Sequence, residues 1–335
     1  MPTISFAGSI GTRQGLPVIE GLFLGFFAME VISGAVPALK GPSAVAMGNF
    51  DGVHLGHQAV LSRLVEVARK AGNTSVVLTF FPHPMAVTAP ERRPPLIQTL
   101  KDRLDCIERC SPVDMVVVVP FTKELAATSA VAFVDEVLLG RLRCQDLFIG
   151  HDARFGRDRE GDIEFLRRCE PRLRLHVLEP IEVAGVRVSS SRIRRLVAAG
   201  DVALAQGMLG RPFSLVGPVV QGAGRGQKLG FPTANLAQEG ELLPGEGVYA
   251  CEAEIAQGTF PAAVHVGPVP TFGVQKLVVE AHLVGFEGDL LGQRLRLSFL
   301  SRLRPVKTFP DPAALASQMA EDVRAAVEVF AHRHG

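Results

Sequence analysis

The spacing of apolar residues changes once along this chain, and that change limits the folds it can adopt. From Ala44 to about Leu209, short β-branched runs alternate with segments whose apolar residues recur at helical spacing. Because β-α-β alternation builds parallel sheets covered by helices, we predict a doubly wound α/β sheet that binds ligands at the carboxyl ends of its strands. The expected strands are 45–47, 76–80, 115–119, 146–149 and 173–178, and the expected helices are 58–70, 101–109 and 131–139.

After the stretch Gly210–Pro212, the apolar period shortens to two. The alternating runs are short and separated by glycine and proline, which predicts a small antiparallel β-barrel. These runs cover 249–255, 277–283 and 295–299. A terminal helix follows, for which Asp311 is the expected N-cap and Pro312 the first residue. Its expected apolar stripe consists of Leu315, Met319, Val323, Val327 and Phe330.

The two patterns divide the chain of 335 residues into three expected parts. These are an N-terminal extension and lead-in (1–40), an α/β domain (41–209) and a barrel domain (212–335). The apolar run 21–29 stands between Glu20 and Glu30 and is shorter than the roughly 18 residues that a membrane span needs. We therefore expect an N-terminal extension here, or a start assigned ahead of Met29, and neither a targeting segment nor a membrane anchor.

Charge and cysteine content exclude several classes of protein. The chain has 35 Lys and Arg against 34 Asp and Glu, a net charge of +1, which argues against a broad electrostatic surface for nucleic acid or membranes. Small polyanions remain possible ligands at local sites. The five cysteines form an odd set without a C-x-x-C pair, so they predict neither a disulfide framework nor a zinc ribbon. A reducing cytoplasm fits this composition.

The segment Met47–His57 (MGNFDGVHLGH) leaves a predicted strand, turns through glycines and opens a helix. His54 and His57 therefore come near a helix N-terminus, where free N–H groups and the helix dipole favour phosphate. Two imidazoles there can donate hydrogen bonds to a triphosphate and to the charge that builds on the α-phosphorus during in-line displacement. An isolated H-x-x-H pair is as consistent with two surface histidines, but the strand, turn and helix around it favour the site.

A second basic motif, Ser189–Arg194 (SSSRIR), follows later in the α/β part. It offers hydroxyl groups, the amides of a helix N-terminus and two guanidiniums, a combination that suits the phosphates leaving as pyrophosphate. The alternative is an ordinary N-capped surface helix.

The barrel part begins with a glycine-rich basic loop, Gln221–Gly230, which runs directly into FPTAN at 231–235. Such a loop brings backbone amides close to phosphates, although it fits neither common nucleotide-binding glycine pattern. Thr233 and Asn235 present hard oxygen atoms on one face of an extended segment, as Mg²⁺ prefers. Glu280 lies on the polar face of the run 277–284, and an exposed strand glutamate is its alternative interpretation.

Together these motifs resemble the bacterial bifunctional riboflavin kinase/FAD synthetases, over almost the whole chain beyond Met29. Further matching stretches are FPHP at 81–84, the segment 150–162, VSSSRIR at 188–194 and PTAN at 232–235. The resemblance implies a Rossmann-like nucleotidyltransferase domain with a parallel sheet, then a riboflavin kinase barrel with a terminal helix. It implies an enzyme that phosphorylates riboflavin with ATP and then adenylylates FMN to give FAD and pyrophosphate. Mg²⁺ is the implied cofactor of both steps.

The resemblance also implies roles for single residues. His54 and His57 become catalytic residues of adenylyl transfer, and Glu280 becomes the general base of the kinase. The implied ATP and phosphate ligands are Gly48, Asn49, Phe50, Asp51, Gly56, Ser190, Ser191, Arg192, Arg194, Gly222, Gly226 and Lys228. The implied flavin ligands are His83, Asp152, Arg154 and Phe155, and the implied metal ligands are Thr233 and Asn235. Structural roles are the alternative for His83 and for the charged residues of 150–162.

The sequence departs from the family pattern at several positions. Ala153 replaces a usual Phe, Gln227 replaces a frequent Arg, and Leu291 replaces the Tyr of L-Y-G. The segment 265–269 (HVGPV) replaces N-I-G-x-R. Two alternatives therefore stay open, an FAD synthetase with a weakened or inactive kinase module and a flavin-binding protein without turnover. We expect a cytoplasmic enzyme, a monomer or weak homo-oligomer, that acts on small molecules and has no nucleic-acid or membrane partner.

Overall fold

The computed structural model describes residues 29–169, 172–222, 226, 229–269 and 276–334. They form two compact units. The first unit contains the described residues up to Asn49, then Val60–Arg93 and Ile107–Glu179. The second contains Phe50–Ala59, Pro94–Cys106 and the described residues from Pro180 onward. Of the N-terminal extension and lead-in expected at 1–40, residues 1–28 lie outside the described residues.

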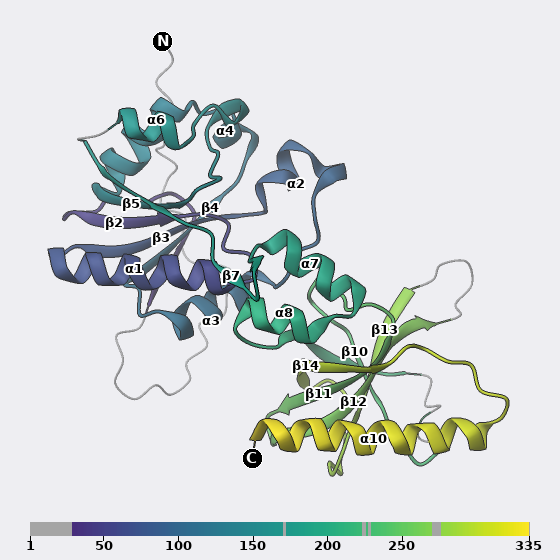
Figure 1. The fold of residues 1–335 in the computed structure, drawn as a ribbon. Helices are drawn as coiled ribbons and strands as arrows, with labels where there is room; N and C mark the ends of the chain where they lie inside the picture. The colour runs from purple at the N-terminus through teal and green to yellow at the C-terminus, as the bar shows by residue number, and fades with distance from the viewer. Residues whose placement is uncertain (1–28, 170–171, 223–225, 227–228, 270–275, 335) are drawn as a thin grey trace. The chain divides into compact units, whose positions relative to one another are not determined.

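The first unit is built on a six-stranded sheet in the order β1-β4-β3-β2-β5-β6, in which every pair of neighbours is parallel (Figure 1). The strands are β1 (Glu30–Ser33), β2 (Ser43–Met47), β3 (Thr74–Phe81), β4 (Met115–Pro120), β5 (Cys144–Gly150) and β6 (Arg174–Leu178). The central strands are buried on both faces, as their continuous apolar runs require. The predicted parallel α/β sheet is confirmed, with one edge strand, β1, that the sequence did not reveal.

Short helices and turns connect these strands. They are α1 (Leu55–Ala71), α2 (Pro84–Thr88), η1 (Pro90–Arg92), α3 (Leu100–Cys110), α4 (Lys123–Ala126), α5 (Ala130–Ala132), η2 (Phe133–Arg141), η3 (Arg157–Arg159) and α6 (Ile163–Arg168). The helix expected at 131–139 continues from α5 into the π-helix η2, whose Phe133, Val134, Val137 and Leu138 enter the core formed with the strands. An α-helix and a π-helix each bury one stripe of apolar residues, so the apolar pattern alone did not distinguish the two helix types.

The strand order reverses at β2, with β3, β4 and β1 on one side and β5 and β6 on the other. In doubly wound sheets, ligands bind beyond the carboxyl ends of the strands at such a reversal. The segments that begin at Gly48 and at His151 leave the carboxyl ends of β2 and β5. The fold therefore predicts that a ligand binds at these two segments.

The second unit contains a small hairpin, two helices and the barrel. The hairpin pairs β7 (Glu182–Val183) with β8 (Val186–Arg187), and the helices are α7 (Ser190–Ala199) and α8 (Val202–Leu209). Gly200 and Gly210 end the two helices with φ of 86° and 71°, a left-handed conformation that glycine adopts at low cost. Buried residues of α7 and α8, such as Ile193 and Leu209, belong to the same apolar cluster as the barrel interior.

The barrel is closed, in the order β10-β13-β12-β11-β14-β9, and all its pairings are antiparallel. Its strands are β9 (Phe213–Val220), β10 (Ala234–Leu236), β11 (Gly247–Ile255), β12 (Gly258–Val269), β13 (Lys276–Leu283) and β14 (Arg294–Arg304). The alternating residues Tyr249, Cys251, Leu295, Leu297 and Phe299 are all fully buried. The predicted small barrel is confirmed.

The terminal helix α10 (Pro312–His334) packs against β11, β12 and β14 of the barrel (Figure 1). Asp311 caps it, because its Oδ1 accepts the backbone N–H of Ala314 at 2.8 Å. The predicted apolar stripe is wrong at Val327, which is 37% exposed. The helix buries Asp322 and Ala326 instead, and the Asp322 carboxylate accepts two hydrogen bonds from Arg304, at 2.8 and 2.7 Å.

Candidate active sites

The segment between β2 and α1, which contains the two histidines and is called here the motif loop (48–57), has an unusual backbone. Phe50 and Val53 are both buried and have φ of 50° and 37°, and Gly52 has φ of 88°. A positive φ is costly for a β-branched residue such as Val53. Backbone of this kind persists where many surrounding contacts fix it, and it clusters at functional sites.

Asp51 supplies one set of these contacts. Both oxygens of its buried carboxylate lie 3.1 Å from the Ile97 backbone N–H, and Oδ2 also accepts a hydrogen bond from Arg194 at 2.6 Å. Ser190 donates its hydroxyl to the Asp51 backbone carbonyl at 2.9 Å. The structure thus brings together three predicted phosphate ligands, Asp51, Ser190 and Arg194, from segments about 140 residues apart.

Arg211 supplies a second set, which sequence reasoning missed. Its guanidinium donates to the backbone carbonyls of Gly52 and Val53 at 2.8 and 3.2 Å and to Oε1 of Gln98 at 3.1 Å. In the sequence, Arg211 appeared only as part of a boundary between two patterns. No local signal could have revealed a contact that joins residues more than 150 positions apart.

The rings of His54 and His57 stack, with centroids 3.6 Å apart and planes 15° from parallel. The backbone N–H of His57 donates to Nδ1 of His54 at 3.3 Å. A neutral His54 therefore carries its proton on Nε2, where it can be donated to a ligand. Nδ1 of His57 is buried and has no hydrogen-bond partner in the described part of the chain.

Both histidines are held neutral. Burial, reinforced by the positive charges of Arg211 and Arg194, lowers the pKa of His54 from 6.5 to about 4. Burial also lowers the pKa of His57 well below its usual range, and His54, Arg103 and Arg211 act in the same direction. The positive charge beside the two rings is therefore carried by arginines, while each imidazole offers one neutral N–H donor.

Other predicted residues of the motif loop and of α7 have defined local roles. Gly56 leaves room for the His54 ring, because a Cβ at position 56 would lie 3.2 Å from two of its atoms. The first turn of α7 is capped by Ser189, whose hydroxyl accepts the Arg192 backbone N–H at 3.3 Å. Ser191 is exposed and Arg192 is half-buried, and neither side chain hydrogen bonds to the motif loop within the described residues.

The first unit holds two further predicted residues, Asn49 and His83, next to each other. Nδ2 of Asn49 lies 3.4 Å from Nε2 of His83, and Thr79 donates to the Asn49 carbonyl at 3.2 Å. Nδ1 of His83 accepts the Met85 backbone N–H at 3.1 Å and so caps α2. His83 therefore has a structural role, and its predicted flavin contact stays a prediction.

The segment after β5 separates into half-buried and exposed predicted residues. Phe155 is half-buried, with ring centroids 5.7 and 5.9 Å from those of Phe133 and Phe165, and packs against the apolar core of the first unit. Asp152 and Arg154 are exposed, and a nitrogen of Arg154 lies 3.7 Å from the Asp162 carboxylate. The flavin role predicted for Phe155, Asp152 and Arg154 stays a prediction, and Phe155 has a packing role besides.

The barrel carries a pocket of about 510 Å³. It brings together the predicted Gly222, Thr233 and Asn235 with Leu291, one of the departures from the family pattern. No side chain would fit at Gly222, because a Cβ there would overlap the Asn235 amide, and a Cβ at Gly226 would lie 3.2 Å from the Thr233 hydroxyl. The predicted ligand Lys228 lies outside the described residues.

The register of the barrel strands places three polar residues in one row. Asn235 of β10 pairs with Glu280 of β13, and Glu280 pairs with His265 of β12. Directly paired residues have Cβ atoms about 4.5–5.5 Å apart, so Glu280 stands between the other two. Two residues further on, His282 contacts the Pro232 carbonyl through Nδ1 at 2.8 Å. The row joins the predicted general base to a predicted metal ligand.

Comparison with known proteins matches both halves of the chain. The family described as FAD synthetase matches residues 36–192, and the family described as riboflavin kinase matches residues 209–330. A solved structure described as a macrolide-efflux protein from Streptococcus pneumoniae has 26% identity and a TM-score of 0.79, over 88% of this chain and 98% of that one. Among the described residues, no helix combines the length and apolar character of a membrane span.

Relatives with both activities in their names align over most of the chain. A bifunctional riboflavin kinase/FMN adenylyltransferase of Pseudomonas fluorescens is 37% identical over 84% of this chain and 90% of its own length. The protein of the same name from Escherichia coli K12 is 33% identical over 90% of this chain and 98% of its own length. The family resemblance predicted from the motifs is confirmed, and the chain belongs to the bifunctional riboflavin kinase/FMN adenylyltransferase family.

Proposed function

We propose that this chain phosphorylates riboflavin to FMN in its barrel and transfers the adenylyl group of ATP to FMN, giving FAD and pyrophosphate. Both enzyme families match the chain, and relatives named for both activities align with it. ATP and flavins are therefore its substrates. The observation that carries the adenylyl-transfer assignment is the stacked pair of neutral histidines, His54 and His57, in a strained loop braced by Arg211.

In adenylyl transfer, a phosphate oxygen of FMN attacks the α-phosphorus of ATP, and pyrophosphate leaves. His54 and His57 donate hydrogen bonds to the phosphate oxygens on which charge builds, and preorganised donors of this kind contribute without rearrangement. Arg194 offers positive charge to the leaving pyrophosphate. Asp51, whose carboxylate already accepts from Arg194 and Ile97, acts as a positioning residue for that guanidinium and does not touch phosphate itself.

In the kinase reaction, the ribityl 5′-hydroxyl attacks the γ-phosphorus of ATP, its proton moves to the carboxylate of Glu280, and ADP leaves. The pairing of Glu280 with Asn235 supports this assignment, because it sets the proton acceptor beside a residue that lines the pocket of the barrel. The same row of residues supports an active kinase rather than the alternative of a weakened or inactive kinase module.

The residues of the barrel pocket fit Mg²⁺. Thr233 and Asn235 offer hard oxygens, and the absent side chains at Gly222 and Gly226 let the loop backbone approach them. The described residues contain no cluster of three or more His, Cys, Asp or Glu that would hold a metal, which suits an ion bound largely by substrate phosphates. Thr233 and Asn235 would hold the ion, which supplies charge neutralisation of the phosphates when bound.

We further propose that the enzyme works in the cytoplasm, since all five cysteines are free thiols. We also propose that it is a monomer or weak homo-oligomer. The experiment that tests the function is a time course of the full-length protein with riboflavin, ATP and Mg²⁺, in which FMN and FAD are separated by chromatography. FMN followed by FAD is the expected result. If FAD formed only from supplied FMN, the protein would instead be an FAD synthetase with an inactive kinase module. If neither riboflavin nor FMN gave a product, both activities would be rejected.

A further inference from the structure

Arg103, in the first turn of α3, is a buried cation that has no hydrogen-bond or ion-pair partner among the described residues. It is 1% exposed, the largest of the fully buried side chains in the described part of the chain. Its Nε has no hydrogen-bond partner, and among the described residues its guanidinium makes no hydrogen bond or ion pair. Buried arginines are nearly always paired, because an uncompensated charge in the interior is strongly unfavourable. The missing partner therefore needs an explanation.

The surroundings of Arg103 locate it beside the motif loop. Its positive charge lowers the pKa of His57, and burial lowers its own pKa against the opposing charge of Asp51. Asp51 does not serve as its partner, because that carboxylate already accepts from Ile97 and Arg194. The charged groups that shift the pKa values of His54, His57 and Arg103 are three guanidiniums, of Arg103, Arg194 and Arg211, and one carboxylate, of Asp51.

Two further unpaired donors or acceptors belong to the same group. Within the described residues, Nε2 of Gln98 is buried without a partner, although Oε1 of that amide accepts from Arg211, and Nδ1 of His57 is also unpaired. The described residues contain four such buried side-chain atoms, and three of them are on His57, Gln98 and Arg103. Since buried polar atoms in folded proteins are nearly all satisfied, this concentration indicates that a ligand completes the set.

We propose that Arg103 binds the phosphate chain of the nucleotide in adenylyl transfer, with Nε2 of Gln98 as a second donor. This inference rests on the proposed function of the motif loop. The ligand is a polyphosphate because the excess of two positive charges suits a multiply charged anion, and because Arg103 stands beside His57, which donates to the same chain. A planar guanidinium can bind two phosphate oxygens at once.

The reverse reaction tests this proposal in the full-length protein, since FAD and pyrophosphate then give FMN and ATP. For Arg103→Met we expect kcat/KM for pyrophosphate to fall about 100-fold, the loss typical of one preorganised donor, with little change in KM for FAD. If the anion bound by Arg103 were the phosphate of the flavin, KM for FAD would rise instead. Riboflavin phosphorylation should be unchanged, and the Tm of the protein without ligand should not fall, because a buried unpaired charge is removed.

Two further variants separate binding from folding. Arg109→Met removes an exposed arginine of the same helix and should leave the kinetics of the reverse reaction unchanged. Arg103→Lys keeps the charge but loses the planar fork, and should give a loss between those of Arg103→Met and wild type. Unchanged kcat/KM for pyrophosphate in both Arg103 variants would overturn the inference. A wild-type protein that makes no ATP from FAD and pyrophosphate would reject the proposed function itself.

Discussion

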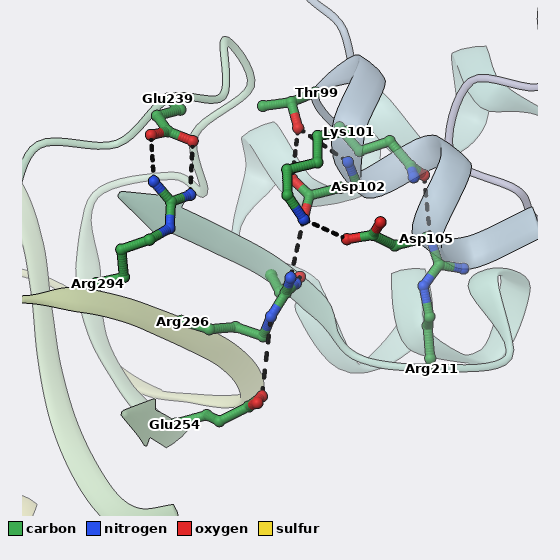
Figure 2. Close-up of polar contacts among 11 residues, drawn as sticks. Thr99, Lys101, Asp102, Asp105, Arg211, Glu239, Glu254, Arg294 and Arg296 are labelled. Atoms are coloured by element: carbon green, nitrogen blue, oxygen red, sulfur yellow. Dashed lines mark hydrogen bonds and ion pairs between the residues drawn. The ribbon is translucent and has the colours of Figure 1, made fainter. Parts of the chain in front are cut away.

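Arg296, on barrel strand β14, donates to the carboxylate of Asp102 in the first turn of α3 at 2.9 Å (Figure 2). Asp102 also accepts from the Thr99 hydroxyl at 2.7 Å, so a side-chain hydrogen bond links the first turn of α3 to the residue that directly precedes the helix. The two side chains are 23 and 17% exposed, so water screens their ion pair only in part. Asp102 directly precedes Arg103. A strand of the barrel therefore anchors the helical turn that presents Arg103.

Arg296→Ala should reduce FAD formation from FMN by several-fold and leave riboflavin phosphorylation nearly unchanged. The physical reason is that Asp102 loses its cation and the first turn of α3 gains freedom, which misplaces Arg103 and Gln98. Steady-state kinetics of the two half-reactions measure the effect. Arg294→Ala is the matched control, because Arg294 lies on the same strand and pairs with Glu239 at the surface (Figure 2). Equal losses in both variants would contradict an anchoring role for Arg296.

Combining Arg296→Ala with Asp102→Ala adds a check on whether the two residues act together. We expect their effects on kcat/KM for adenylyl transfer to be non-additive, with a coupling of about 1 kcal/mol, as for contacting residues in one network. Full additivity would mean that the two side chains act independently.

His57→Ala should lower the rate of FAD formation by roughly 10²–10³, because a preorganised donor to the transition-state charge is lost. FMN formation from riboflavin should continue at the rate of the unmodified protein. Chromatography of both products from one reaction compares the two activities directly. Equal loss of both activities in a folded variant would contradict the assignment of His57 to adenylyl transfer alone.

Glu280→Gln should reduce riboflavin phosphorylation by roughly 10²–10⁴, since glutamine keeps the shape of the side chain but accepts no proton. Conversion of supplied FMN to FAD should remain unaffected. Glu287→Gln, an exposed glutamate in the turn after the same strand, serves as the control. A normal rate of FMN production by Glu280→Gln would mean that Glu280 is not the general base and has only a structural role beside Asn235.

The stability of the protein should decrease in mild acid. His54 has a pKa of about 4 in the folded state and 6.5 as its ordinary value, so the unfolded chain takes up the proton first as the pH falls. The contribution of a neutral His54 is therefore fully present above pH 6.5 and is lost as the pH drops toward 4, with an upper size of about 3 kcal/mol. His57 acts in the same direction.

Thermal unfolding at about pH 7.5 and about pH 5 measures this loss, and the loss should be smaller in His54→Asn than in wild type. His332→Asn, on the exposed surface of α10, should behave as wild type. An identical acid dependence in all three proteins would exclude His54 as a cause.

Some elements of the fold could be predicted from the sequence and others could not, for physical reasons that differ from one element to the next. The motif loop was predictable because its strand, glycines, histidines and helix are contiguous. The barrel strands β11, β13 and β14 were predictable because period-two alternation survives in them, whereas β9, β10 and β12 were not identified from the sequence. β1 was not, since a four-residue edge strand with exposed side chains has no apolar run. Val327 was misassigned because Asp322, a carboxylate, takes the buried position through its contact with Arg304.

Arg103 left a signal in the sequence that periodicity alone does not interpret. It stands between Leu100 and Ile107 on the apolar stripe of α3, where a cation is out of place. Such a position indicates either a buried ion pair or a ligand, and only the surroundings in the structure distinguish the two. Gln98 and Arg211 left no comparable signal, because they contact each other and the motif loop across long separations in the sequence.

The second unit is assembled from three separate stretches of chain, and one of them, Phe50–Ala59, contains both histidines of the motif loop. A proteolytic cut anywhere within residues 50–179 therefore divides both units at once. A fragment that ended at Leu209 would keep α7 and α8 but lose the barrel residues that bury them, and so would present new apolar surface to water. The two activities have separate motifs, yet the two compact units interleave along the polypeptide, so a single cut between the motifs does not coincide with the division between the units.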